Sequence, residues 1–361
     1  MRKSKLIIGV ITLIVFTIVA SGCVFGPKEE ASVEVDPPQI DYTEGENSEG
    51  VTIEIDETNG EVEVSKEGEA AKEVNRQLYL FDHQGRVTPI TVKLPHTESV
   101  ATQVLEYLVI DGPVTELLPD GMRAVLPAGT QMSVKVEEDG TAVVDFSKEF
   151  EQYQAEDEKG ILEAITWTLT QFDSIKQVSI KINGYEQEVM PVNGTPIPKK
   201  ISRQDGINIE VADGTKIGNS SVLTLYFKAQ NPSATHDYYV PVSRVVPKTD
   251  DLVKATVEEL VKGPLLNSGL YSDIVSTTKV DVTLEGKTAK LNFDEKFLKT
   301  SLDGEKASDD ALNSLVLSLT ETGLVDQVQF MVNGESKMLT LAGQELTQPV
   351  SRPLSVNPSG F

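Results

Sequence analysis

The chain has 361 residues, of which 56 are Asp or Glu and 32 are Lys or Arg, so its formal net charge at pH 7 is −24. Nucleic-acid binding requires clustered Lys and Arg to contact phosphates, and no basic stripe with interleaved aromatic residues occurs here. The composition therefore argues against a polyanionic partner and indicates an acidic surface that repels other anionic surfaces.

Residues 1–22 have the three parts of a lipoprotein signal peptide. Arg2, Lys3 and Lys5 precede an apolar run over residues 6–20, and small residues follow it. A bilayer-spanning helix needs roughly 20 apolar residues, whereas the apolar part of a signal peptide is about 7 to 15 long. The length therefore favours a cleaved signal over a membrane span.

Cys23 is the only cysteine of the chain and comes directly after Ser21 and Gly22. A lone cysteine in a secreted protein has no partner within the chain, which favours a modified thiol. We predict cleavage after Gly22 and a lipid anchor on Cys23, a diacylglycerol with palmitate chains, at the extracytoplasmic face of the cell membrane. The alternative is an uncleaved anchor helix with a buried Cys23.

Residues 23–75 form an acidic segment that contains many Glu and Asp residues, several Pro residues and few apolar ones. Such a composition cannot bury enough apolar area to offset the chain entropy, so we expect a disordered spacer. Alternation of apolar and polar residues between 51 and 64 leaves a short strand or hairpin as the alternative there.

The rest of the chain repeats itself. The segment 177–184, QVSIKING, recurs as QVQFMVNG at 327–334, and the segment 141–150 recurs at 288–297. Near-constant offsets in one order indicate a duplicated module. We predict a first copy over 76–200, a linker over 201–220, and a second copy over 221–361 that includes a C-terminal arm. Because Ile201-Ser202-Arg203 is echoed by Val350-Ser351-Arg352, each copy should carry a trailing arm that packs on itself or on its neighbour.

The elements of the first copy follow from hydrophobic periodicity. A hairpin covers 78–81 and 87–92, with Pro89 at an edge. A helix capped by Thr97 or Ser99 follows and ends at Gly112. Two strands, 132–136 and 142–146, precede a second helix, and a last strand leads into a turn. The second helix should bury one apolar stripe, formed by Ile161, Leu162, Ile165, Leu169 and Phe172, and the turns Asn183-Gly184 and Asn333-Gly334 should have positive φ.

The order is thus β-β-α-β-β-α-β in each copy. Alternating strands indicate a sheet with one covered face, so two helices should pack on one side of a small antiparallel or mixed sheet of about five strands. We predict an α+β fold with two tandem homologous domains.

No convergent set of reactive side chains is visible. His83, His96 and His236 are scattered and lack the spacing of a metal pair, so we expect them to be solvated. Gly218-Asn219-Ser220-Ser221 departs from a nucleophile elbow at its last position. We expect Glu163 to lie on a solvated helix face, Trp167 to lie in the core, and Asp145, replaced by Asn292 in the second copy, to have no catalytic role. The sequence predicts no catalytic residue, cofactor, metal or small-molecule substrate, and Cys23 is the one modified residue.

Signal, acidic spacer and duplicated module together resemble the GerMN-domain family of sporulation and spore-germination lipoproteins of endospore-forming bacteria. The second copy departs from the family pattern at 273–277, where Asp273-Ile274-Val275-Ser276-Thr277 stands in place of the Leu-Pro-x-Gly-Thr element. The matching residues are Leu78-Tyr79-Leu80-Phe81, Leu126-Pro127-Ala128-Gly129-Thr130, Ala142-Val143-Val144-Asp145-Phe146-Ser147, Thr168-Leu169-Thr170-Gln171-Phe172 and Asn183-Gly184.

The resemblance implies a non-enzymatic lipoprotein on the outer forespore membrane, facing the intermembrane space. There it would support the channel complex between mother cell and forespore through contacts with the channel proteins, with domains similar to ring-building motif domains. The alternative is a peptidoglycan-active or wall-binding envelope lipoprotein. A solute-binding lipoprotein is disfavoured because the repeat lacks long alternating β-α units.

Overall fold

The computed structural model describes residues 73–216, 218–302 and 304–359. All of them belong to one compact unit, Val35–Phe361. The predicted signal peptide, the lipidation site Cys23 and residues 23–72 of the predicted spacer lie outside the described residues. Among the helices that are described, none is both long enough and apolar enough to cross a bilayer.

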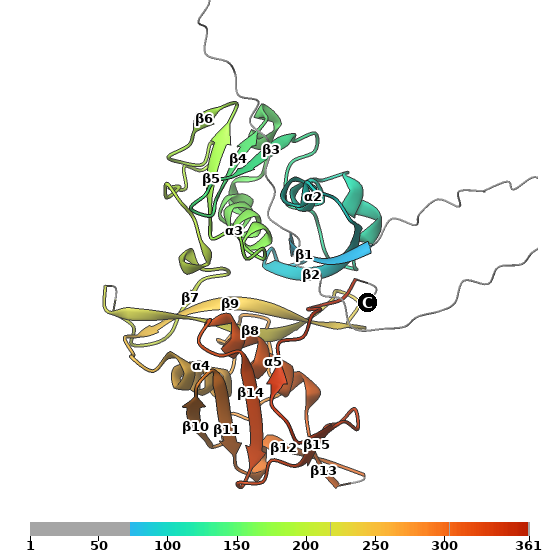
Figure 1. The fold of residues 1–361 in the computed structure, drawn as a ribbon, viewed down its shortest axis with the longest axis vertical. Coiled ribbons are helices and arrows are strands. Elements are labelled where there is room, and N and C mark those ends of the chain that lie inside the picture. The colour runs from blue at the N-terminus through green and yellow to red at the C-terminus, as the bar shows by residue number, and fades with distance from the viewer. Residues whose placement is uncertain (1–72, 217, 303, 360–361) are drawn as a thin grey trace, which may run out of the picture. The chain divides into compact units, whose positions relative to one another are not determined.

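The first copy has three layers: a two-stranded hairpin, a pair of helices and a four-stranded sheet (Figure 1). The helix α3 contacts both hairpin strands and β5, and α2 contacts α3 and β3. The sheet order is β3-β4-β5-β6, with β4 and β5 parallel and the other neighbours antiparallel. The elements are β1 (Glu73–Phe81), β2 (Val87–Pro95), α2 (Val100–Glu106), β3 (Met132–Val136), β4 (Thr141–Phe146), α3 (Glu158–Leu169), β5 (Gln177–Ile182) and β6 (Tyr185–Glu186), with 3-10 turns at Pro113–Leu117, Lys148–Glu151 and Ala155–Asp157.

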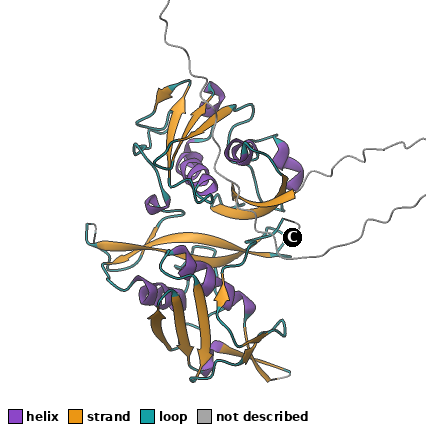
Figure 2. Cartoon of the chain, viewed as in Figure 1, coloured by secondary structure: helices purple, strands orange, loops and turns teal. Residues whose placement is uncertain are grey.

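The second copy repeats these layers after a connecting segment that contains a 3-10 turn (Arg203–Asp205) and β7 (Glu210–Val211). Its sheet order is β10-β11-β14-β17, again with one parallel pair, β11 and β14. An additional hairpin precedes its second helix (Figure 2). The elements are β8 (Ser220–Gln230), β9 (Asp237–Pro247), α4 (Leu252–Lys262), β10 (Val280–Glu285), β11 (Thr288–Phe293), a 3-10 turn (Glu295–Phe297), β12 (Leu298–Ser301), β13 (Gly304–Ala307), α5 (Asp309–Glu321), β14 (Gln327–Val332), β15 (Met338–Leu339), β16 (Glu345–Leu346) and β17 (Val350–Ser351).

The α+β class, the duplication and the order of elements are confirmed. The strands of each copy nevertheless do not form one sheet of about five strands. In the first copy, β1 and β2 form a sheet apart from β3-β4-β5-β6. In the second copy, β8 and β9, with β7 beside β9, form a sheet apart from β10-β11-β14-β17, and β12-β13 and β15-β16 are two further two-stranded sheets. The helices therefore lie between two sheets. The boundaries 76–200, 201–220 and 221–361 stay predictions.

Close packing explains why the hairpin forms its own layer. A Cβ atom added to Gly160 of α3 would lie 2.3 Å from Cε1 of Phe81 in β1, so glycine is what lets the helix approach the hairpin this closely. Residues 161–169 of α3 are all buried, including Glu163 and Thr168. A helix buried on every side needs a second covering layer, and the hairpin supplies it.

Two local predictions for the first helix were wrong. The helix ends at Glu106 and does not continue to Gly112, because the carbonyl of Leu108 accepts hydrogen bonds from the backbone amides of Val125 and Leu126. Ser99 occupies the N-cap position, but neither predicted hydroxyl caps the helix. Thr97 Oγ1 instead accepts from the amide of Ser99. Tertiary contacts thus end α2 earlier than the sequence pattern predicts.

Candidate functional site

The candidate site is the junction between the two copies, where polar side chains of both copies form hydrogen bonds and ion pairs. Strand β2 of the first hairpin contacts β9 of the second. Two segments cross this contact: the first arm (residues 201–211) and the second arm (residues 350–359). The arms follow the last long strands of the two copies, as the echoed triplets predicted, and each packs on its own copy and on the neighbour.

Asn208 anchors the first arm between the hairpins. Its Nδ2 donates to the carbonyls of Val87 in β2 (2.7 Å) and Pro241 in β9 (2.8 Å), and its Oδ1 accepts from the amide of Val87 (2.9 Å). One short amide side chain thus satisfies three backbone groups from two copies. Its φ is +46°, a conformation that asparagine tolerates better than most residues.

Asn357 does the same for the second arm. Its Nδ2 donates to the carbonyls of Pro89 in β2 (2.8 Å) and Tyr239 in β9 (2.7 Å), and its Oδ1 accepts from the amide of Tyr239 (2.7 Å). The residue is 5% exposed and has φ of +51°. Thr91 continues the contact, because its amide donates to the Asn357 carbonyl and its carbonyl accepts from the amide of Ser359.

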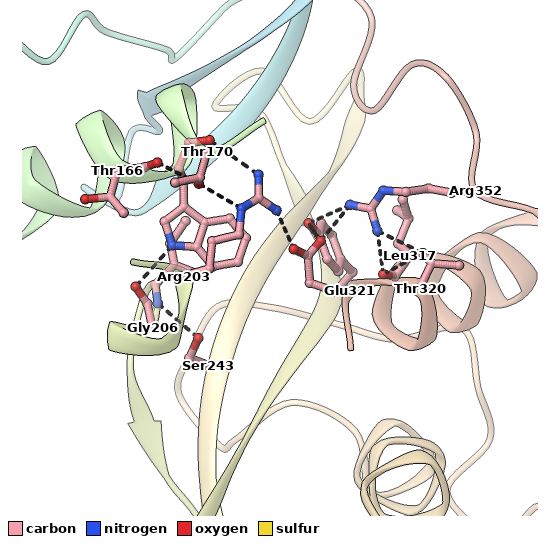
Figure 3. A network of polar contacts seen from close by, with 12 residues as sticks. Thr166, Thr170, Arg203, Gly206, Ser243, Leu317, Thr320, Glu321 and Arg352 are labelled. Carbon is pink, nitrogen blue, oxygen red and sulfur yellow. Dashed lines mark hydrogen bonds and ion pairs between the residues drawn. The ribbon is translucent and has the colours of Figure 1, made fainter. Parts of the chain in front are cut away.

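Two arginines, one from each arm, converge on the carboxylate of Glu321 at the end of α5 (Figure 3). Arg203 donates through Nη1 to Oε1, and Arg352 donates through Nη2 to Oε2 at 2.8 Å. The hydroxyl of Tyr226 also donates to Oε2 at 3.0 Å. Charge-assisted bonds of this kind are about twice as strong as neutral ones.

Electrostatics keep this cluster ionised. Burial alone would raise the pKa of Glu321, but the guanidinium groups of Arg203 and Arg352 outweigh it and hold that pKa below its ordinary value. Burial would lower the pKa of each arginine, but the pKa is raised above the ordinary value instead, by Glu321 for Arg203 and by Tyr226 together with Glu321 for Arg352. The cluster is therefore a permanent ion triad at neutral pH.

Each arginine also covers an aromatic ring of its own copy. Arg203 lies 4.4 Å from the ring centre of Trp167, and Arg352 lies 5.4 Å from that of Tyr226. Trp167 is fully buried, as predicted for a core residue, and its Nε1 donates to the carbonyl of Gly206 in the first arm. Since it is the only tryptophan of the chain, its fluorescence reports directly on the junction.

Loops close the junction at its rim. Asp82 binds Arg86 and accepts from the hydroxyl of Tyr238 across the junction at 3.1 Å. Asn231 donates to Asp120 of the first copy at 3.2 Å. The long 231–237 loop, which replaces a shorter loop in the first hairpin, thus serves as a contact between copies.

The predicted site residues have structural positions. His83, His96 and His236 are exposed and do not come together, and no group of three or more His, Cys, Asp or Glu side chains suited to a metal ion occurs within 73–359, outside the two undescribed positions. Asp145 Oδ1 accepts from the amide of Gly184 (2.9 Å), and Asn292 Oδ1 accepts from Gly334 (2.8 Å). The exchange of Asp for Asn between copies therefore preserves one backbone contact.

The turn prediction is confirmed: φ is +50° at both Asn183 and Asn333, and +80° and +83° at the glycines that follow. The prediction for Glu163 was wrong. This side chain is buried, not solvated, and accepts from the amide of Asn208 at 2.9 Å. Burial raises its pKa, which the Asn208 amide and Lys159 partly offset.

Sequence reasoning missed Asn208, Asn357 and Glu321. A signal for the asparagines was present, because each follows the arginine of its echoed triplet by five residues. Chemically, the arrangement of amides, guanidinium groups and one carboxylate holds two modules in one geometry and offers no nucleophile beside a base.

Comparison with known proteins identifies the relatives of this arrangement. The profile of the family Germane, described as "Sporulation and spore germination", matches residues 77–188 and 224–337, one match in each copy. The chain is 40% identical over 369 residues, covering 100% of both chains, to "Spore germination protein GerM" of Bacillus subtilis (strain 168).

Among solved structures, it is similar to "Tandem GerMN domains of the sporulation protein GerM from Bacillus subtilis", with 43% identity and a TM-score of 0.74. The match covers 80% of this chain and 100% of that one. These likenesses extend over both copies, and the chain belongs to the Germane family of sporulation and spore germination proteins.

Proposed function

We propose that this protein is a non-enzymatic sporulation lipoprotein that supports the assembly and localisation of the channel complex between mother cell and forespore. A diacylglycerol on Cys23 would hold it on the outer forespore membrane, facing the intermembrane space. The observation that carries the proposal is the 40% identity to GerM over the whole length of both chains, a relative whose name states a role in germination and no enzymatic activity.

The described surface offers one kind of binding element in each copy. Strand β3 and strand β10 are edge strands, each hydrogen-bonded to a neighbour on one side only. An open edge can accept a strand from another protein through main-chain hydrogen bonds. In β10 the exposed residues include Thr283, Leu284 and Glu285, and Leu284 is 47% exposed. We propose that channel proteins contact the protein at these edges.

The test is complementation of a Bacillus subtilis strain that lacks GerM. The full chain should restore the yield of heat-resistant spores, and it should co-purify with channel proteins from sporulating cells. The variant Cys23→Ser should reduce both the membrane fraction of the protein and the spore yield at least tenfold.

Leu284→Asp should reduce co-purification, whereas Leu324→Asp should leave it unchanged. Leu324 is a matched control because it is 45% exposed and lies outside any strand. The proposal fails if the chain does not complement, or if Cys23→Ser complements fully. Pelleting of the purified protein with insoluble peptidoglycan, without channel proteins, would favour the wall-binding alternative.

A further inference from the structure

The contacts of the two arms exchange when the two copies are exchanged. Asn208 bonds both backbone groups of Val87 in its own copy and the carbonyl of Pro241 in the other. Asn357 bonds both backbone groups of Tyr239 in its own copy and the carbonyl of Pro89 in the other. Val87 and Tyr239 are equivalent positions, as are Pro89 and Pro241, at the same offset of 152 residues.

The next contact along each arm follows the same rule. The Ile207 amide donates to Ser243 Oγ of the second hairpin at 3.0 Å. The Val356 amide donates to Thr91 Oγ1 of the first hairpin at 2.9 Å. Thr91 and Ser243 again differ by 152 residues. Each arm therefore crosses to the hairpin of the other copy at the equivalent position.

This reciprocity is the property of an isologous interface, in which one surface patch meets another copy of itself about a two-fold axis. Here the axis relates two halves of one chain, so it is a pseudo-two-fold axis. The surface made by a hairpin and an arm is self-complementary. The part of the predicted linker that follows the first arm, residues 212–219, only determines which two copies meet, and it is called the linker from here on.

The ion triad departs from this symmetry and disfavours the pairing of two first copies. Gln171 stands where Glu321 stands, and its side chain bonds the backbone of Gln77. Two first copies would bring two arginines together without a carboxylate. A first copy with a second copy supplies the carboxylate that both arginines contact, so this pair is favoured over two first copies.

We propose that this surface is a self-recognition site: the linker supplies the other copy of the same chain to it, and a second chain of this protein takes that place where the linker cannot turn back. The first copy of one chain binds the second copy of the other, and the reverse, so that two chains exchange copies and form a closed dimer. The exchange requires only that the linker extends between the chains instead of turning back.

Without the linker, one chain cannot bring its own two copies together at the junction. Asn208 bonds Pro241, whereas Ser220 pairs with Pro247, six residues further along β9 and hence about 20 Å away at roughly 3.3 Å per residue. After deletion of residues 212–219, four Cα steps join Asn208 to Ser220 and span at most about 15 Å. Both contacts then form only between two chains.

The experiment uses residues 73–361, because the tandem segment of the Bacillus subtilis relative was solved as a unit. Light scattering after gel filtration should give the mass of one chain for the unaltered segment and twice that mass for the deletion variant. The emission maximum of Trp167 should be the same in both, because the junction is intact in both. Adding Asn208→Ala and Asn357→Ala to the deletion should weaken the dimer at least about thirtyfold, since each of its two junctions loses the two hydrogen bonds that join different chains, to Pro241 and to Pro89.

A deletion variant with the mass of one chain at every concentration would overturn the proposal. So would a dimer in which Trp167 emission is shifted to the red, or one that the two asparagine substitutions leave unaffected. If circular dichroism shows that the deletion variant is unfolded, the test uses the double variant Gly214→Pro and Gly218→Pro without the deletion. Those glycines have φ of +78° and +84°, which proline cannot adopt, so the closed path of the linker is disfavoured at full length. The dimer fraction after refolding should rise at least twofold, and an unchanged fraction would refute the proposal.

Discussion

Replacing Glu321 with Gln tests the ion triad with a minimal change of shape. The substitution places in the second copy the residue that the first copy has at this position, Gln171. A neutral amide oxygen can accept from one guanidinium, but the amide nitrogen then faces the other as a second donor. Arg203 and Arg352 would therefore lose their shared counter-charge.

The expected loss of stability follows from the burial of the three side chains. Glu321 is 8% exposed, while Arg203 is 29% and Arg352 is 27% exposed. Removing one partner of a fully buried ion pair costs about 3–5 kcal/mol. Because both arginine side chains remain partly exposed to solvent, we expect a loss of stability at the lower end of this range, about 3 kcal/mol. In a chain of this size the melting temperature should fall by roughly 6–9 °C.

The assay is denaturant unfolding of residues 73–361 followed by Trp167 fluorescence, at pH 7 and at pH 3. The folded-state pKa of Glu321 is lowered, so its contribution is present above the ordinary value of 4.5 and is lost as the pH falls through the folded-state pKa. The difference between the unaltered chain and Glu321→Gln should shrink as the pH falls below about 4.5.

Two results would refute this reasoning. One is a difference below about 1 kcal/mol at pH 7, which is the value of an exposed surface pair. The other is a difference that stays the same at pH 3, because below the ordinary pKa of 4.5 the unfolded chain binds a proton at Glu321, which favours unfolding of the unaltered chain and not of the Gln variant. The control is Arg203→Gln combined with Glu321→Gln, which should cost less than the sum of the two single changes because the variants share one interaction.

Three further predictions concern single positions. Gly121→Ala should lower the stability of the chain by about 2 kcal/mol or more, because the new Cβ would lie 2.4 Å from a proline of the 231–237 loop. The control is Gly85→Ala, which has a similar φ and no atom within 4 Å of the new Cβ, and which should lower the stability by only about 1 kcal/mol in the same melting assay. Glu158→Gln should speed proteolysis within 190–196 at pH 7, because this carboxylate accepts three backbone amides of that loop. Burial would raise its pKa, but these bonds hold it at about 2, so the difference should fade as the pH drops from 4.5 toward 2. Asp145→Asn should change stability by less than about 0.5 kcal/mol, whereas Asp145→Ala should cost about 1 kcal/mol because the Gly184 amide loses its acceptor.

Repetition made much of the fold predictable. Segments such as 177–184 and 327–334 fix the order of strands and helices twice over, and Asn183-Gly184 identifies a turn because few residue pairs tolerate consecutive positive φ. The trailing arms were also predictable from an echoed triplet. These features are encoded locally, so one chain suffices to find them.

The layers and the junction were not predictable in the same way. A 3.6-residue stripe marks one covered face of α3, and nothing in that pattern indicates that a hairpin covers the opposite face and buries Glu163. The additional hairpin β12–β13 has no counterpart in the first copy to indicate it. Asn208 and Asn357 are single polar residues in irregular segments, and their role depends on backbone groups far away in the sequence.

The position of Asn357 has a consequence for the order in which the molecule is made. This residue follows every helix and strand of the described fold in the sequence and yet bonds Pro89, in the second strand of that fold. Domains generally form as units, the N-terminal one first, while synthesis proceeds. The first copy can thus acquire its own core early, but its hairpin gains that bond only after the second arm has been synthesised. The contact between the two copies is therefore completed only by a segment that is made after the elements of both cores.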